Sequence, residues 1–215
     1  MDFRKRAEEL VSQMTFDEKI AQMRFATPAI ERLGVQGYNW FNECLHGVAR
    51  QGTATVFPQA IGMAASFNDE LLFEVADTIS TEARAKYNEF KKHGPTDYYR
   101  GITFWSPNIN IFRDPRWGRG HETYGEDPYL TGRMGAAFVK GLQGDGKYYK
   151  VDSTLKHYAV HSGPEATRHS FNSVVSEKDL YETYLWAFQY CIDHVKPAAV
   201  MGAYNRTNGE VCCGS

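Results

Sequence analysis

The sequence predicts an α/β fold built from parallel βα units. Strand-like and helix-like segments alternate along the chain, and the main helix-like segments run for ten or more residues. This spacing is typical of parallel strands joined by helical crossovers. The 215 residues, 42% of them hydrophobic, are enough for one sizeable core. An open, doubly wound sheet and a barrel both fit the alternation.

The first part of the chain predicts short helices. Residues 4–14 form a charged amphipathic segment, and Thr15 and Glu18 are spaced as a capping box that starts a second helix at Phe16. Residues 28–33, closed by Gly34, suggest another helical turn. An aromatic-rich loop follows, and the segment IGMAASF at 61–67 is predicted to be a buried strand.

The middle of the chain predicts two long helices separated by an extended segment. Asn68 is suited to cap a helix over 69–93 that Gly94 ends. The stretch ITFWSPNINIF at 102–112 is predicted to be extended. Asp127 followed by Pro128 pairs an N-cap with a favourable first helical residue, which predicts a helix to about residue 142.

The last part predicts two strands around another helix. DSTLKHY at 152–158 and AAVMGAY at 198–204 are the strands, and Ser176 caps the helix between them. Asn208-Gly209 indicates a turn. No Gly-x-Gly-x-x-Gly follows a strand, which argues against a dinucleotide site. Four or five strands, against the eight of a barrel in about 250 residues, predict an unfinished barrel.

Composition excludes several classes of protein. A net charge of -2 gives no basic excess for nucleic acid. No stretch approaches the ~18 apolar residues of a membrane span, and no secretory signal is visible. Cysteines at 44, 191, 212 and 213 form no C-x-x-C pair, so neither a zinc site nor a disulfide framework is expected. We therefore expect a cytoplasmic protein, or a secreted one if a signal has been removed.

Candidate binding residues lie where the predicted strands end, as they do in α/β barrels. Lys156 and His157 close one strand, and their donors and acceptors suit vicinal hydroxyls. The alternative is a solvated lysine beside a packed histidine. His157 and His161 are four residues apart but lack the glutamate of H-E-x-x-H, so no metal is expected.

Two further segments carry candidate side chains. Arg119 lies between two glycines in a densely charged loop at 110–130, which is otherwise interpreted as a salt-bridged surface. Glu43 lies among aromatic residues that could stack on a sugar face, and its alternative is an ion pair with Arg50. Tyr204, at the end of another strand, is a weaker candidate.

These stretches together resemble family 3 of the glycoside hydrolases. The matching pieces occur in the family's order and cover nearly all of the chain: MTFDEKIAQM, YNWFNECLHGVA, TVFPQAIGMAASF, FWSPNINIFRDPRWGRGHETYGEDPYL, STLKHY and MGAYNRTNGE. The resemblance implies that residues 1–215 are an incomplete N-terminal (β/α)8 barrel domain, of the TIM type, whose pocket binds a terminal sugar. It implies no cofactor, and its expected partner is a small glycoside or oligosaccharide.

By motif, the resemblance implies sugar-binding roles for Glu43, Arg119, Lys156 and His157, and places Tyr204 near the nucleophile. Members that act on β-glucosides typically carry Asp where this chain has Glu43. The longer side chain would crowd the C6 hydroxymethyl group that xylose lacks, so the β-xylosidase branch is implied.

The resemblance also implies a retaining mechanism in which an Asp attacks the anomeric carbon and a Glu protonates the leaving oxygen. The resemblance places the Asp in a G-x-V-x-S-D-type strand after the YNRTNG segment, and the Glu in a later domain. No S-D follows Tyr204 in the sequence, so both carboxylates are expected beyond Ser215. No catalytic residue is therefore assigned, and the chain alone is expected to be inactive. The open alternatives are β-glucosidase or α-L-arabinofuranosidase activity, or a non-catalytic sugar-binding module. Phe41 and Cys44 depart from the Trp and Ala that are more frequent in the β-xylosidase branch.

Overall fold

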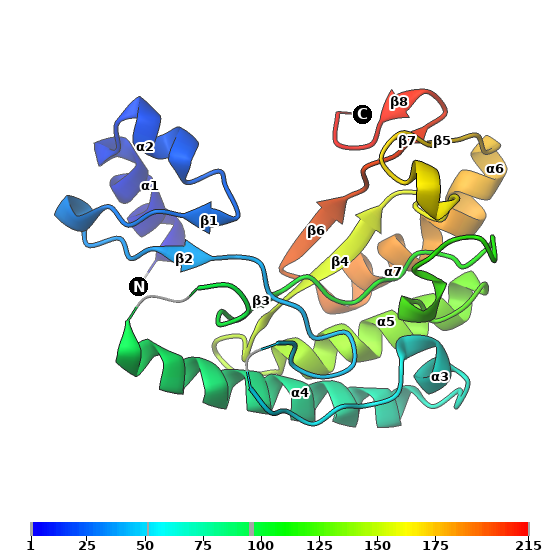
Figure 1. Ribbon diagram of the computed structural model, residues 1–215, viewed down its shortest axis with the longest axis horizontal. Helices are drawn as coiled ribbons and strands as arrows, with labels where there is room; N and C mark the ends of the chain where they lie inside the picture. Colours follow the sequence, from blue (N-terminus) through cyan, green and yellow to red (C-terminus); the bar gives the residue numbers. More distant parts are fainter. Residues whose placement is uncertain (1, 51, 95–96, 215) are drawn as a thin grey trace.

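The computed structural model describes residues 2–50, 52–94 and 97–214, and it has the predicted α/β architecture of a partial barrel (Figure 1). Its centre is a parallel sheet in the order β3 (Thr103–Phe104), β4 (Asp152–Tyr158), β6 (Ala199–Gly202). A parallel bridge between Asn42 and Phe104 brings the segment before Glu43 beside β3. The carboxyl ends of neighbouring segments therefore meet at one edge.

Three helices cover this sheet on one side. They are α4 (Asp69–Phe90), α5 (Pro128–Gln143) and α7 (Trp186–Val195). Helix α5 lies between the other two and also contacts β4 (Figure 1). Ten of its sixteen residues are buried, because it faces helices on two sides and the sheet on a third. The main hydrophobic core is therefore centred on α5, with buried residues of α4, α7 and the sheet packed around it.

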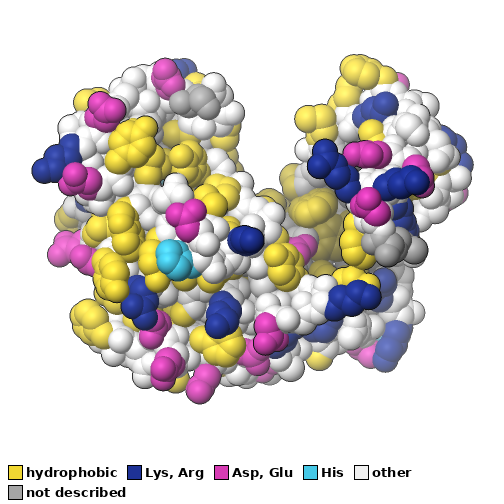
Figure 2. Space-filling model, turned by 180° about the vertical axis from the view of Figure 1, so that it is seen from behind, with side chains coloured by type: hydrophobic (Ala, Val, Ile, Leu, Met, Phe, Trp, Pro, Cys, Tyr) yellow, Lys and Arg dark blue, Asp and Glu magenta, His cyan; other side chains and the backbone are white. Residues whose placement is uncertain are grey.

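Residues 2–39 form a small lobe beside the sheet, which we call the N-terminal lobe. Its elements are α1 (Phe3–Gln13), α2 (Phe16–Ala21), β1 (Ala26–Thr27), η1 (Glu31–Leu33) and the antiparallel partner of β1, β2 (Tyr38–Asn39). Figure 2 shows the molecule hollowed between this lobe and the end that carries the C-terminus.

The remaining elements are short and lie mostly in the loops around the sheet. They are α3 (Ala60–Ala64), η2 (Lys91–His93), η3 (Gly120–Glu122), η4 (Glu165–Thr167), β5 (Asn172–Ser173), α6 (Glu177–Asp179), the π-helical turn η5 (Leu180–Tyr184), β7 (Arg206–Thr207) and β8 (Glu210–Val211). Strand β7 pairs with β5 in parallel and with β8 antiparallel.

Several local predictions are confirmed. Thr15 and Glu18 form both hydrogen bonds of the capping box, and Asn68 and Asp127 accept bonds from the first turns of α4 and α5. Strand β4 has the predicted bounds. Ser176 caps a helical segment as predicted, but η5 divides that segment into α6 and α7.

One prediction is wrong. The segment IGMAASF, expected to be a buried strand, instead contributes to helix α3, which begins after Pro58 and Gln59. Ala60 and Ala64 are the buried residues of this helix, and their spacing of four places them on one helical face. A short run of small apolar residues fits a strand or a helix equally well, and alanine favours the helix.

None of the helices in the described ranges is long and apolar enough to cross a membrane.

Helices α4 and α5 approach closely at Gly141. A Cβ atom built there would lie 2.5 Å from the carbonyl oxygen of Phe73 and 2.9 Å from the amide nitrogen of Asp77. Both atoms belong to the backbone of α4, so neither can rotate away. The hydroxyl of Ser80 adds a bond of 3.1 Å to the carbonyl oxygen of Gly141 across the same contact. The sequence therefore needs glycine here for close packing.

We predict that Gly141→Ala lowers the free energy of unfolding by about 1–3 kcal/mol, because an added methyl group overpacks the contact. The matched control is Gly62→Ala in α3, where the new Cβ would meet only the side chain of Pro58, at 3.8 Å. The control should be neutral or stabilising, since alanine has the higher helix propensity. Urea unfolding of both variants measures the difference, and equal effects would contradict the argument.

Candidate sugar-binding site

Four of the five predicted site residues lie together where neighbouring parallel segments end. Glu43 directly follows the bridged residue Asn42, whereas Lys156 and His157 occupy the last part of β4. Arg119 comes from the loop after the extended segment that follows β3, and Asn108 of that segment bridges to Lys156. The topology thus assembles residues that are more than a hundred positions apart.

Glu43 and Lys156 form an ion pair, and the hydroxyl of Ser106 donates to the second carboxylate oxygen of Glu43 at 2.9 Å. Lys156 is 1% exposed, whereas the Glu43 side chain is 22% exposed. A buried ammonium group needs a counter-charge, so this pair holds the carboxylate at a fixed position. The alternative partner Arg50 instead stacks on the ring of Tyr99, with its guanidinium carbon 5.2 Å from the ring centre.

Arg119 is held by a carboxylate that the sequence analysis did not assign to the site. Its Nε and Nη2 atoms donate to the two oxygens of Glu122, at 2.7 and 2.6 Å. Burial alone would raise the pKa of Glu122, but the hydrogen bonds and charge of Arg119 outweigh it, so the pKa lies below its usual value. Glu122 is therefore a fixed anion that orients the guanidinium group.

His157 lies next to this pair and is neutral. Its Nε2 atom is 3.1 Å from Nη1 of Arg119, and its other ring nitrogen contacts Asn110 at 3.0 Å. Burial, together with His161 4.5 Å away between ring centres and the charge of Arg119, holds the pKa of His157 well below its ordinary value. Burial also lowers the pKa of His161.

Tyr204 is placed differently from the other four predicted residues. It is 64% exposed, and its ring stacks on His169 with 4.8 Å between ring centres. Within the described part of the chain, no recorded hydrogen bond or ring contact joins it to the other four. Ser106, Asn110 and Glu122 are the neighbours of the site that the sequence analysis missed. Of these, only Glu122 had a feature that the sequence displays, an acidic side chain three residues after Arg119.

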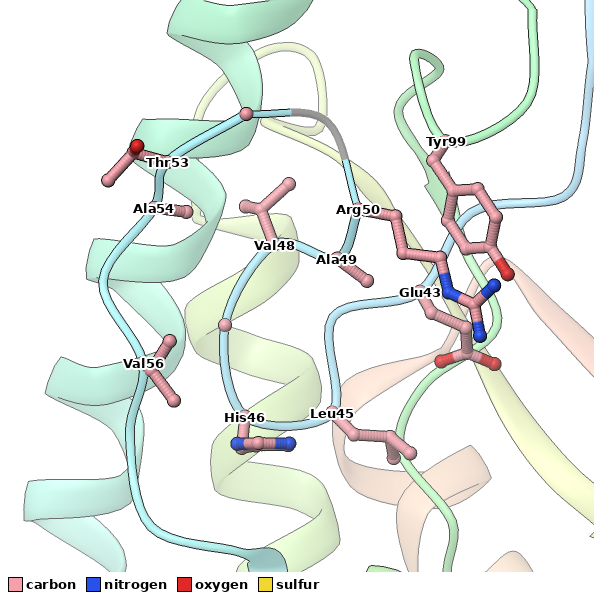
Figure 3. A pocket seen from close by; sticks show the side chains of 12 residues that line it. Glu43, Leu45, His46, Val48, Ala49, Arg50, Thr53, Ala54, Val56 and Tyr99 are labelled. Carbon is pink, nitrogen blue, oxygen red and sulfur yellow. The ribbon is translucent and has the colours of Figure 1, made fainter.

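A pocket of about 580 Å³ adjoins Glu43 (Figure 3). The side chain of Arg50 extends towards Glu43 and Tyr99 at one end of this pocket, and Val48 and Val56 line the other end. The region thus offers a carboxylate, cationic donors and an aromatic ring, which suits a ligand with several hydroxyl groups and an apolar face. The described residues contain no cluster of three or more metal-ligating His, Cys, Asp or Glu side chains.

We predict that Glu43→Gln lowers the free energy of unfolding by about 3–5 kcal/mol, because it leaves the ammonium group of Lys156 buried without a counter-charge. Lys156→Met should cost less, since it removes the buried charge and leaves a partly exposed carboxylate that keeps its bond to Ser106. Urea unfolding of both variants and of the double variant gives the coupling energy. Equal losses in the two single variants would count against the pair.

We also predict that stability falls as the pH is lowered from 6.5 towards 5. The unfolded chain binds protons at its histidines near pH 6.5, whereas His157 and His161, with their lowered pKa values, bind them only at lower pH in the folded state. Protons therefore favour the unfolded state, by up to about 1.4 kcal/mol per pH unit for each histidine. Denaturant unfolding at several pH values measures the slope, which should be shallower in His157→Asn. A flat profile in the parent protein would refute the prediction.

Comparison with known proteins identifies the family. The profile of the "Glycosyl hydrolase family 3 N terminal domain" matches residues 7–215. A "Xylan 1,4-beta-xylosidase" from Xylanibacter ruminicola is 52% identical over 99% of this chain and 25% of its own length. The chain therefore spans about a quarter of that relative.

Two solved structures share the fold. The exo-β-xylosidase XlnD, in complex with a xylobiose aziridine probe, superposes with a TM-score of 0.89 and 33% identity over 100% of this chain and 29% of its own. A β-glucosidase from Kluyveromyces marxianus, in complex with glucose, gives a TM-score of 0.82 and 33% identity over 97% of this chain and 24% of its own. With the profile match, these likenesses show that the chain belongs to glycosyl hydrolase family 3, within the N-terminal domain of that family.

Proposed function

We propose that this chain is the sugar-recognising part of an exo-acting β-xylosidase that releases terminal xylose with retention of configuration. Residues 1–215 are part of its N-terminal (β/α)8 barrel domain. Glu43, Arg119, Lys156 and His157 bind the sugar ring, and Tyr204 lies near the nucleophile. The nucleophile and the acid/base are supplied by segments other than these residues.

The observation that carries this proposal is the anchoring of Glu43. Its two oxygens are held by Lys156 and Ser106, so the carboxylate cannot swing out of the way of a ligand. An aspartate at this position would withdraw the carboxylate by about 1.5 Å, the length of one C–C bond. That difference is enough to admit or exclude a hydroxymethyl group. The name of the Xylanibacter ruminicola relative supports the same substrate.

The binding residues assist catalysis through hydrogen bonds to the ring hydroxyls. Hydrolysis of a glycoside passes through an oxocarbenium-like transition state in which the ring flattens. Contacts that are stronger in this geometry than in the ground state lower the barrier. The fixed carboxylate of Glu43 and the fixed guanidinium of Arg119 are suited to this task, because neither has to reorganise as the ring changes shape.

Activity on β-glucosides is the second candidate, because the Kluyveromyces marxianus enzyme shares the fold and holds glucose. α-L-Arabinofuranosidase activity is the third candidate within the same class. A non-catalytic sugar-binding module is the alternative from another class. It predicts that the isolated chain binds xylose. It also predicts that products of the gene that are longer than this chain do not hydrolyse xylosides.

We predict that Glu43→Asp raises the ratio of kcat/KM for an aryl β-glucoside to that for an aryl β-xyloside by about tenfold, the effect of one methylene group in a pocket. The assay uses the longest in-frame product of the gene. Glu82→Asp is the control, since that carboxylate bonds to Thr55 rather than to the site residues. An unchanged ratio in Glu43→Asp would defeat the steric argument, and no hydrolysis of either glycoside would defeat the proposed function.

A further inference from the structure

Asn110 makes three hydrogen bonds to a single residue, His157. Its Oδ1 atom accepts from the backbone N–H of His157 at 2.8 Å and lies 3.0 Å from Nδ1 of the imidazole ring. Its Nδ2 atom donates to the carbonyl oxygen of His157 at 2.8 Å. Asn110 is 3% exposed and His157 is 4% exposed. Asn110 thus forms hydrogen bonds with both the main chain and the side chain of a residue on the neighbouring strand.

The main-chain bonds determine which way the amide of Asn110 faces. A backbone N–H can only donate and a backbone carbonyl can only accept. The amide atom beside the N–H of His157 is therefore oxygen, and the atom beside its carbonyl is nitrogen. It is the same oxygen that faces Nδ1 of the ring. Because this oxygen can only accept, Nδ1 has to carry the proton.

The other side of the ring leads to the same tautomer independently. Nε2 of His157 is 3.1 Å from Nη1 of Arg119. A guanidinium group has five N–H donors and no acceptor, so Nε2 must be unprotonated and must accept. A neutral imidazole has one donor and one acceptor, and both neighbours assign them in the same way.

The charges around the ring exclude the doubly protonated form. Burial is the largest cause that lowers the pKa of His157, and the neighbouring groups His161, Arg119, Lys156 and Arg168 lower it further. His161 is itself fixed in the same manner, because Oδ1 of Asn205 lies 3.1 Å from its Nδ1 atom. Nε2 is therefore unprotonated in both rings, and that of His161 is buried without a hydrogen-bond partner among the described residues.

A count of the N–H groups of Arg119 shows what this tautomer achieves. Nε and one N–H of Nη2 donate to Glu122, and one N–H of Nη1 donates to His157. Two of the five N–H groups remain for a ligand. If Nε2 of His157 carried a proton instead, its N–H would oppose the N–H of Arg119, and the guanidinium group would lose one of its two supports.

We propose that Asn110 is a positioning residue that acts through His157 on Arg119. It fixes His157 as the Nδ1–H tautomer, so that Nε2 and the carboxylate of Glu122 together hold the guanidinium group with two N–H groups free for a ligand. That the ligand is a sugar hydroxyl rests on the proposed function. The tautomer and its dependence on Asn110 do not.

The test is the tautomer of His157, observed in long-range ¹H–¹⁵N correlation spectra of the full chain labelled with ¹⁵N-histidine. The signal of His157 is assigned by its loss in His157→Gln. The parent protein should show Nδ1 protonated and Nε2 bare. An unprotonated Nδ1 in the parent protein would overturn the proposal. Because this measurement needs no ligand, its result is independent of whether the protein has xylosidase activity.

Variants of Asn110 test whether this residue is the cause. In Asn110→Leu the Nδ1–H would be buried without an acceptor, while Arg119, which is partly exposed, can turn to water. The proton should therefore move in whole or in part to Nε2. Asn110→Asp keeps the accepting oxygen and should retain the parent tautomer at about pH 9, where an added carboxylate leaves the ring neutral.

The matched control is Asn205→Leu, which removes the equivalent acceptor from His161. It should change the signal of His161 and leave the tautomer of His157 as in the parent protein. An unchanged His157 tautomer in Asn110→Leu would overturn the role of Asn110. If the leucine variant does not fold, the spectra of the parent protein and of Asn110→Asp still decide the proposal, because loss of the parent tautomer in either contradicts it.

Discussion

The ammonium group of Lys156 is buried at the end of the central strand, and the architecture around the site follows from the need to neutralise it. A buried charge that lacks a partner is strongly destabilising, so a carboxylate must reach it. Glu43 is that carboxylate, and its position brings the segment after Asn42 against the extended segment that contains Ser106. The ion pair therefore joins three parts of the chain that are distant in sequence, and it fixes an acceptor in the adjoining pocket.

Much of the framework could be predicted from local sequence, because it depends on local interactions. Asn68 and Asp127 start their helices through hydrogen bonds to the first helical turn. Strand β4 coincides with the predicted segment, and most of its residues are buried. Helix α3 could not be predicted in the same way. Its sequence suits two backbone conformations, and the choice depends on packing that the sequence does not display.

The site was predictable in part for a similar reason. Strand ends and motif resemblance pointed to Glu43, Arg119, Lys156 and His157, which the structure brings together. The partner of Glu43 could not be chosen from sequence, since Arg50 is seven residues away and Lys156 more than a hundred. Nor could the role of Asn110 be inferred, because it depends on a contact across neighbouring strands and on the directions of three hydrogen bonds.

The contact at Gly141 has a mechanical consequence. Side chains are the compliant part of a packed interface, since they can change rotamer, whereas at Gly141 the backbone of α5 meets backbone atoms of α4 and the Cβ atom of Ala76, which has no rotamers. The two helices are therefore expected to move as one rigid body beneath the sheet, in keeping with the low compressibility of close-packed interiors. Loops at the ends of the strands can then adjust to a ligand while the base that carries them keeps its shape.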